Sequence, residues 1–182
     1  LDMTIANVSV LTIAGGLAVT PTQGTWVITS YAVAEAITVP LTGWFTQRYG
    51  SVKVFVIAMA AFGVFSGLAG MSSSLGFLIF ARVLQGMAGG PLMPLSQTLL
   101  LRIFPKEKAG AATGIWAMTT LVGPVLGPIL GGWICDNASW PWIFLINLPI
   151  AAACAWICWK VLRRYETKIV RNPIDVVGFI LL

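Results

Sequence analysis

The sequence contains no histidine and very little charge, because aspartate, glutamate, lysine and arginine together make up only 9% of its 182 residues. A soluble domain usually carries about 25% charged residues, so this composition excludes an ordinary soluble fold. The three cysteines fit small apolar packing positions and form no group of metal ligands. No phosphate-binding loop or nucleophile elbow is present either, so the sequence does not favour an enzyme.

Long apolar runs dominate the chain, and apolar residues make up 58% of it. A helix needs about 20 mostly apolar residues to cross the hydrocarbon core of a bilayer. Such runs lie at 25–45, 54–72, 75–100, 110–134 and 141–162, and further apolar segments lie at 1–19 and from 176 onward. The sequence therefore predicts an all-α polytopic membrane protein. It starts without methionine and stops within an apolar run, so we expect a fragment of a longer protein.

The basic residues alternate along the chain with turns that contain none. Ten of the eleven lie in or beside three of the segments that join the spans, whereas the turns at 21–24, 72–74 and 135–139 have no lysine or arginine. The positive-inside rule then assigns the three lysine- and arginine-containing loops to the cytoplasm. These cytoplasmic loops are 46–53, 101–109 and 163–174. Attraction to nucleic acid would not explain the alternation, so we predict no nucleic-acid partner.

Three ionisable residues interrupt the apolar spans: Asp2, Glu35 and Arg82. Charged groups in the bilayer are costly and usually face protein or a wet cavity. A buried carboxylate can exchange protons where burial and a nearby cation oppose each other. We predict that these three residues take part in proton coupling. For Arg82, the alternative is a side chain that reaches back to the outer interface.

Small and polar residues recur on single helical faces, at spacings of three and four. These faces hold Arg82, Gly86, Gly89, Met93 and Ser96 on the fourth span and Tyr31, Glu35, Thr38 and Thr42 on the second. On the fifth span, Gly123, Gly127 and Gly131 form a groove, and Pro124 and Pro128 should bend the helix. The fifth span is thus either a tight helix pair alone or a packed joint that can also bend.

Five segments, in order, resemble motifs of the major facilitator superfamily, most closely its fourteen-span drug:proton antiporters of the EmrB/QacA type. They are LDMTIANVSVLTIAG (1–15), GWFTQRYGSVK (43–53), RVLQGMAGGPLMP (82–94), GPVLGPILGGWI (123–134) and SWPWIFLINLPI (139–150). The resemblance implies site residues in the first span (Asp2, Thr4, Asn7), the loop (Gly43, Arg48, Gly50, Lys53), the fourth span (Arg82, Gln85, Gly86) and the fifth, or antiporter, motif (Gly123, Pro124, Gly127, Pro128, Gly131, Gly132).

The resemblance also implies a fold: the N-terminal six-helix bundle of a transporter, built from two inverted three-helix repeats. The bundle would occupy residues 1–162, with a cytoplasmic basic loop at 163–174 and the start of the next transmembrane helix at 175–182. The first and fourth spans would line the cavity. The fifth span would rock against the other bundle during alternating access.

The function implied is drug:proton antiport, in which the proton gradient drives lipophilic drug-like compounds out across the bacterial inner membrane without a cofactor. The resemblance further suggests a periplasmic adaptor and an outer-membrane channel as partners. A proton-coupled uptake symporter and a non-transporting membrane sensor or scaffold are alternatives. The antiporter motif disfavours the first, and the buried charges disfavour the second.

Two positions depart from the family pattern. Gln47 stands where the loop motif usually has an acidic residue before its arginine, and Glu35 stands where no acid is expected. The proposed role of Glu35 therefore depends on its helical face alone.

Overall fold

The computed structural model describes residues 2–167 as a set of packed helices without strands. The predicted helix at 175–182 and part of the basic loop lie outside the described residues. The helices are α1 (Asp2–Val8), α2 (Val10–Gly16), α3 (Pro21–Gly24), α4 (Trp26–Thr38), α5 (Thr42–Tyr49), α6 (Ser51–Gly70), α7 (Leu75–Gly89), α8 (Leu92–Ile103), α9 (Ala109–Asn137), α10 (Trp142–Leu145) and α11 (Asn147–Leu162), with short 3₁₀ turns at Lys106–Lys108 and Arg163–Tyr165.

These helices correspond to the six predicted spans, several of which are interrupted. By length and composition, four helical segments of the described residues can cross a membrane: Ser51–Gly70, Leu75–Ile103, Lys106–Asn137 and Trp142–Tyr165. The first two predicted spans are shorter broken helices, divided at Ser9 and at 39–41. Pro40 and Pro91 lie at two of the breaks, where proline supplies no amide donor to the ladder.

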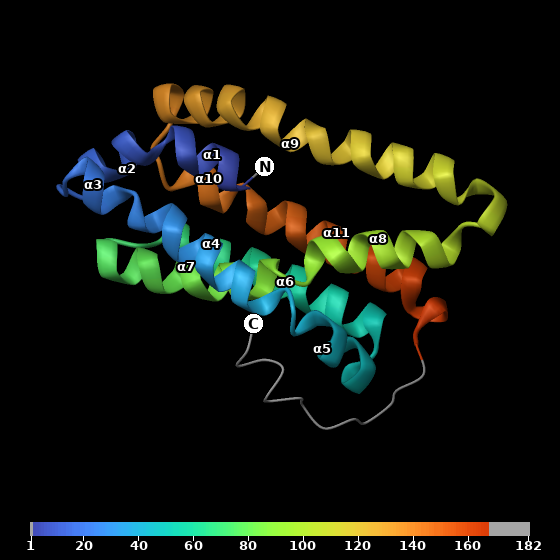
Figure 1. Cartoon of the computed structure of the whole chain (residues 1–182). Coiled ribbons are helices and arrows are strands. Elements are labelled where there is room, and N and C mark those ends of the chain that lie inside the picture. The colour runs from blue at the N-terminus through green and yellow to red at the C-terminus, as the bar shows by residue number, and fades with distance from the viewer. Residues whose placement is uncertain (1, 168–182) are drawn as a thin grey trace.

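The turns without basic residues lie at one end of the molecule, opposite the basic junction between α8 and α9, as the alternation of connections with and without basic residues predicts. Figure 1 shows the turns after α2, α6 and α9 at one end and the junction of α8 with α9 at the other. The α9 helix runs along one side of the bundle and continues through Pro124 and Pro128.

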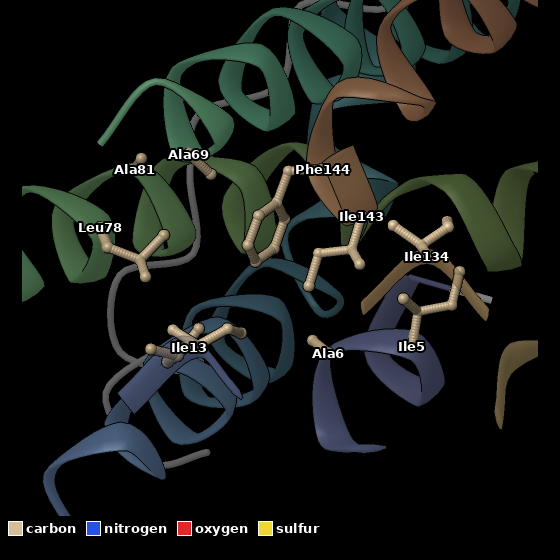
Figure 2. Packing of buried hydrophobic residues seen from close by; sticks show 10 residues of the cluster. Ile5, Ala6, Ile13, Ala69, Leu78, Ala81, Ile134, Ile143 and Phe144 are labelled. Carbon is tan, nitrogen blue, oxygen red and sulfur yellow. The ribbon is translucent and has the colours of Figure 1, made fainter. Parts of the chain in front are cut away.

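The main core lies where α1, α2, α7 and α10 meet. Ile5, Ile13, Leu78, Ile143 and Phe144 are at most 1% exposed, and Figure 2 shows them converging from these helices. This core holds the first and fourth spans together, and both spans carry predicted site residues.

The two polar faces predicted on the second and fourth spans pack against each other. Gly86 of α7 lies against the carbonyl oxygen of Tyr31 on α4. A Cβ added at Gly89 would lie 2.6 Å from the Tyr31 hydroxyl oxygen, and one at Gly90 would lie 2.9 Å from the Thr38 Cβ. The small residues therefore permit close approach of α4 and α7, as membrane helices require when no hydrophobic effect drives them together.

Candidate functional site

Asp2 and Arg82 form an ion pair within the bundle. The Arg82 Nη1 lies 2.6 Å from the Asp2 Oδ2, and the exposed fractions of the two side chains are 0% and 9%. Asp2 comes from α1 and Arg82 from α7, so the pair joins the first span to the fourth. The alternative in which Arg82 reaches back to the outer interface is wrong, because its guanidinium is fully buried and paired.

Arg82 makes two further hydrogen bonds. Its Nε donates to the Val27 carbonyl oxygen at 3.1 Å, and its Nη1 also donates to the Gln85 Oε1 at 2.8 Å. The guanidinium carbon lies 4.1 Å from the ring centroid of Tyr31 and 5.4 Å from that of Phe144, within the range of cation–π attraction. These contacts compensate part of the cost of burying a charge.

Two amide side chains hold the other oxygen of Asp2. The Gln85 Nε2 donates to the Asp2 Oδ1 at 3.1 Å, and the Asn147 Nδ2 donates to the same atom at 3.0 Å. Both carboxylate oxygens therefore accept hydrogen bonds, which is the arrangement expected of the ionised form.

Asn147 extends this network to the third and sixth spans. Its Nδ2 also lies 3.1 Å from the Ser66 Oγ, and the Ser66 hydroxyl donates to the Phe144 carbonyl oxygen at 2.8 Å. Sequence reasoning missed Asn147 and Ser66 as site residues. The available signal was that each is an isolated polar residue within an apolar run, where an unpaired polar group would be costly.

Two buried side-chain polar atoms have no hydrogen-bond partner among the described residues: Arg82 Nη2 and Ser30 Oγ. Unpaired buried donors are uncommon in native proteins and often mark functional positions. Arg82 is thus held at some of its donors and free at another.

Glu35 does not join the network. It lies half-buried on α4, and no hydrogen bond or ion pair of its side chain occurs within residues 2–167. The structure therefore joins two of the three predicted coupling residues by direct contact, whereas Glu35 lies within electrostatic range of Asp2 and Arg82 without bonding to either.

The antiporter motif packs against the first span of this same bundle. A Cβ added at Gly127 would lie 2.5 Å from the Thr4 Cβ, and one at Gly131 would lie 3.2 Å from the Ile5 carbonyl oxygen. Gly132 has open space at its Cβ position, and Gly123 is only half-buried. Pro124 and Pro128 are exposed.

This placement identifies the helix that the glycine groove receives. The face formed by Gly127 and Gly131 is filled by α1 of the same bundle. The cause is backbone proximity: with no side chain at these positions, α9 can approach α1 closely. The rocking of the fifth span against the other bundle stays a prediction. Of the other first-span motif residues, Thr4 makes this contact, whereas Asn7 is exposed.

The loop motif is built around the start of α6. Gly50 has a φ of 93°, a left-handed conformation that favours glycine, and its position faces the Glu166 carboxyl group. Glu166 accepts backbone hydrogen bonds from Val52 at 2.9 Å and Lys53 at 3.0 Å. Sequence reasoning missed Glu166, which caps α6 from the end of the sixth span. The side chains of Arg48 and Lys53 are exposed, and nothing packs at the Cβ position of Gly43.

Comparison with known proteins decides the family. The sequence profile described as the Major Facilitator Superfamily matches residues 1–176. The chain belongs to this superfamily. It is a helical multi-pass membrane protein.

Relatives within the Major Facilitator Superfamily are similar over the whole chain. Identity over 182 residues is 53% to the multidrug export protein EmrB of Haemophilus influenzae and 53% to that of Escherichia coli K12. It is 54% to the fatty acid resistance protein FarB of Neisseria gonorrhoeae. In each case all of this chain is matched, but only 36% of the relative. The chain thus spans about a third of the length of these relatives.

Solved structures support the fold of the superfamily. A peptide transporter POT in complex with sulfate matches 97% of this chain with a TM-score of 0.76 and 12% identity. A POT family transporter in complex with 5-aminolevulinic acid matches 99% with a TM-score of 0.75 and 14% identity. The chain covers 39% and 42% of these two structures, respectively. At such low identity the match concerns the arrangement of helices only.

Proposed function

We propose that this chain is the N-terminal six-helix bundle of a drug:proton antiporter that exports lipophilic compounds across the bacterial inner membrane. The observation that carries the proposal is the buried pair of Asp2 and Arg82, which joins α1 to α7. Charged groups within membrane spans mark ion and proton pathways by default. The bundle would occupy residues 1–162 and the basic cytoplasmic loop residues 163–174.

The hydrogen bonds of Asp2 suggest how a proton would act. Both of its oxygens accept donors, from Arg82 on one side and from Gln85 and Asn147 on the other. Adding a proton to either oxygen places a hydrogen where a donor already points. Protonation would therefore weaken the link from α1 to α7 or to α11, and deprotonation would restore it. A proton gradient could in this way favour one arrangement of the helices over another.

The names of the relatives support export of lipophilic compounds. Two are named for multidrug export and one for fatty acid resistance, at nearly equal identity to this chain. Similarity alone thus favours no single compound, and we assign a lipophilic substrate class. A periplasmic adaptor and an outer-membrane channel are proposed partners of the whole transporter. We also propose that loops 46–53 and 101–109 lie in the cytoplasm.

An uptake symporter of the same superfamily would use a similar proton site. The resemblance of the fifth span to the antiporter motif of exporters favours antiport. In this chain, the same span packs closely on α1, the helix that carries Asp2. A non-transporting scaffold would need tight packing but no buried charge, and Arg82 is fully buried.

Drug uptake driven by an imposed proton gradient in everted membrane vesicles that contain the full-length protein tests these functions. If the protein is an antiporter, a fluorescent lipophilic drug accumulates inside only when the vesicle interior is acidic. A symporter would accumulate substrate when the exterior is acidic, and a scaffold would accumulate none. Either of these two outcomes would contradict the proposal.

A further inference from the structure

An apolar groove lies between α5, α6 and α7, with a cavity volume of about 920 Å³. Its wall on α6 includes Ile57, Ala61 and Phe65, and its wall on α7 includes Leu84 and Met87. These residues recur at spacings of three and four, so each set lies on one helical face.

This groove is separate from the buried ion pair. On α7, Leu84 and Met87 line the groove, whereas Arg82 and Gln85 point into the polar network. Ile57 and Met87 are 66% and 50% exposed, so the groove opens at the surface of the described chain. It cannot be explained as part of the proton site.

Two cationic side chains lie at one end of the groove: Arg48 and Lys53. Both are exposed, and neither has a carboxylate within ion-pair distance in the part of the chain that the structure describes. The Arg48 guanidinium carbon lies 5.3 Å from the Trp44 ring centroid and 5.9 Å from that of Tyr49, which orients it. The amides at the start of α6 are already occupied by Glu166, so any attraction for an anion comes from these two side chains.

We propose that the groove binds one anionic phospholipid of the cytoplasmic leaflet, with its phosphate between Arg48 and Lys53 and an acyl chain along α6 and α7. Basic pockets between membrane helices on the cytoplasmic side suit anionic headgroups. The predicted cytoplasmic loop 46–53 lies at that level, and Trp44 and Tyr49 fit an interfacial belt. The two positive charges that line the groove disfavour a lipophilic cation as the occupant.

Native mass spectrometry of the full-length protein tests the headgroup contact, with phosphatidylglycerol and the zwitterionic phosphatidylethanolamine as probes. The double variant Arg48→Gln/Lys53→Gln should bind phosphatidylglycerol about tenfold more weakly, because each basic residue near the headgroup contributes to attraction. Binding of phosphatidylethanolamine should change less. The control Lys106→Gln/Lys108→Gln removes the same charge from another predicted cytoplasmic loop and should leave phosphatidylglycerol binding unchanged. Equal loss in both double variants, or no loss in the first, would overturn the proposal.

A second measurement tests the acyl contact. Phosphatidylglycerol with a diazirine in its acyl chain is photolysed with the full-length protein in lipid nanodiscs, and labelled peptides are identified. Label should appear on the α6 peptide around Ile57 and Ala61, and it should fall in the Arg48→Gln/Lys53→Gln variant. Absence of label from this peptide would mean that another part of the transporter covers the groove, and the lipid site would be rejected.

Discussion

Gly127 of α9 lies directly against Thr4 of α1, since a Cβ added at Gly127 would be 2.5 Å from the Thr4 Cβ. The contact lies two residues along the chain from Asp2, whose carboxylate binds Arg82. The fifth span therefore sets the position of the helix that carries the buried acid.

The Gly127→Leu variant should remain inserted in the membrane but lose transport. The leucine side chain would collide with Thr4, and overpacking of this kind costs about 1–3 kcal/mol. The collision would displace α1 and with it Asp2. Drug resistance in cells and protein level in isolated membranes are the measurements.

Gly114→Leu is the matched control, because the Cβ position of Gly114 has open space on the same helix and the residue lies outside the antiporter motif. It should transport normally. Normal resistance in the Gly127→Leu variant would remove the contact with α1 from the mechanism.

Arg82→Lys should also lose proton-driven transport, although it keeps the charge. The guanidinium of Arg82 reaches the Val27 carbonyl with one nitrogen and both Asp2 and Gln85 with another. A lysine ammonium has no planar fork to bridge such separated acceptors. Efflux rate in everted vesicles measures the effect.

Arg102→Lys provides the control, because within residues 2–167 Arg102 makes only a partly buried hydrogen bond of 3.4 Å to the Ser51 hydroxyl. We expect near-normal efflux from it. If the lysine at position 82 supports efflux as well as arginine does, the charge alone is sufficient and the geometry is irrelevant.

The sequence predicted the class of fold and singled out Asp2 and Arg82, but it did not predict that they pair or which residues surround them. The spacing of residues along one helix, such as Arg82 and Gln85, shows which face of that helix they occupy. It does not show which other helix, here the one that carries Asp2, packs on that face. Asn147 was not predicted for the same reason. It is one polar residue in an apolar span, and the packing of α11 brings it to Asp2.

Two other features depended on tertiary contacts. The glycine face of the fifth span was predicted, but its occupant, α1, was not. Glu166 lies among basic residues in the sequence, and its capping of α6 requires the end of the sixth span to return to the start of the third. Such a pairing of distant segments leaves no periodic signal in the sequence.

Asn147→Ala should weaken both stability and transport. It removes a donor from the Asp2 Oδ1 and a contact with the Ser66 hydroxyl. Leaving buried polar groups without partners costs about 1–3 kcal/mol. Thermal unfolding of the purified full-length protein and efflux in vesicles are the measurements. Asn137→Ala, which removes an exposed hydrogen bond on α9, should change neither; an equal loss in both variants would argue against a special role for Asn147.

Glu166→Gln should destabilise the start of α6. Both Glu166 oxygens accept backbone amides, and glutamine would turn one of these acceptors into a donor. We expect a loss of about 1 kcal/mol, as for other helix N-terminal caps. Hydrogen exchange of the amides of residues 51–53 should accelerate. Glu107→Gln, in the exposed turn before α9, should leave their exchange unchanged; unchanged exchange in the Glu166 variant would show that the cap does not hold this helix end.

Asp2→Asn should abolish proton-driven export, because a carboxylate that carries protons must reach both charge states and an amide cannot. Asparagine would also turn one oxygen into a donor, facing either Arg82 or the pair of Gln85 and Asn147. Drug binding should remain within about tenfold of the original, or roughly 1.4 kcal/mol. The measurement is drug-induced proton release from proteoliposomes that contain the full-length protein. Glu35→Gln is the comparison and should give a milder loss, since Glu35 makes no direct contact with Asp2 or Arg82. Undiminished proton release from the Asp2 variant would refute its role and transfer the proton site to Glu35.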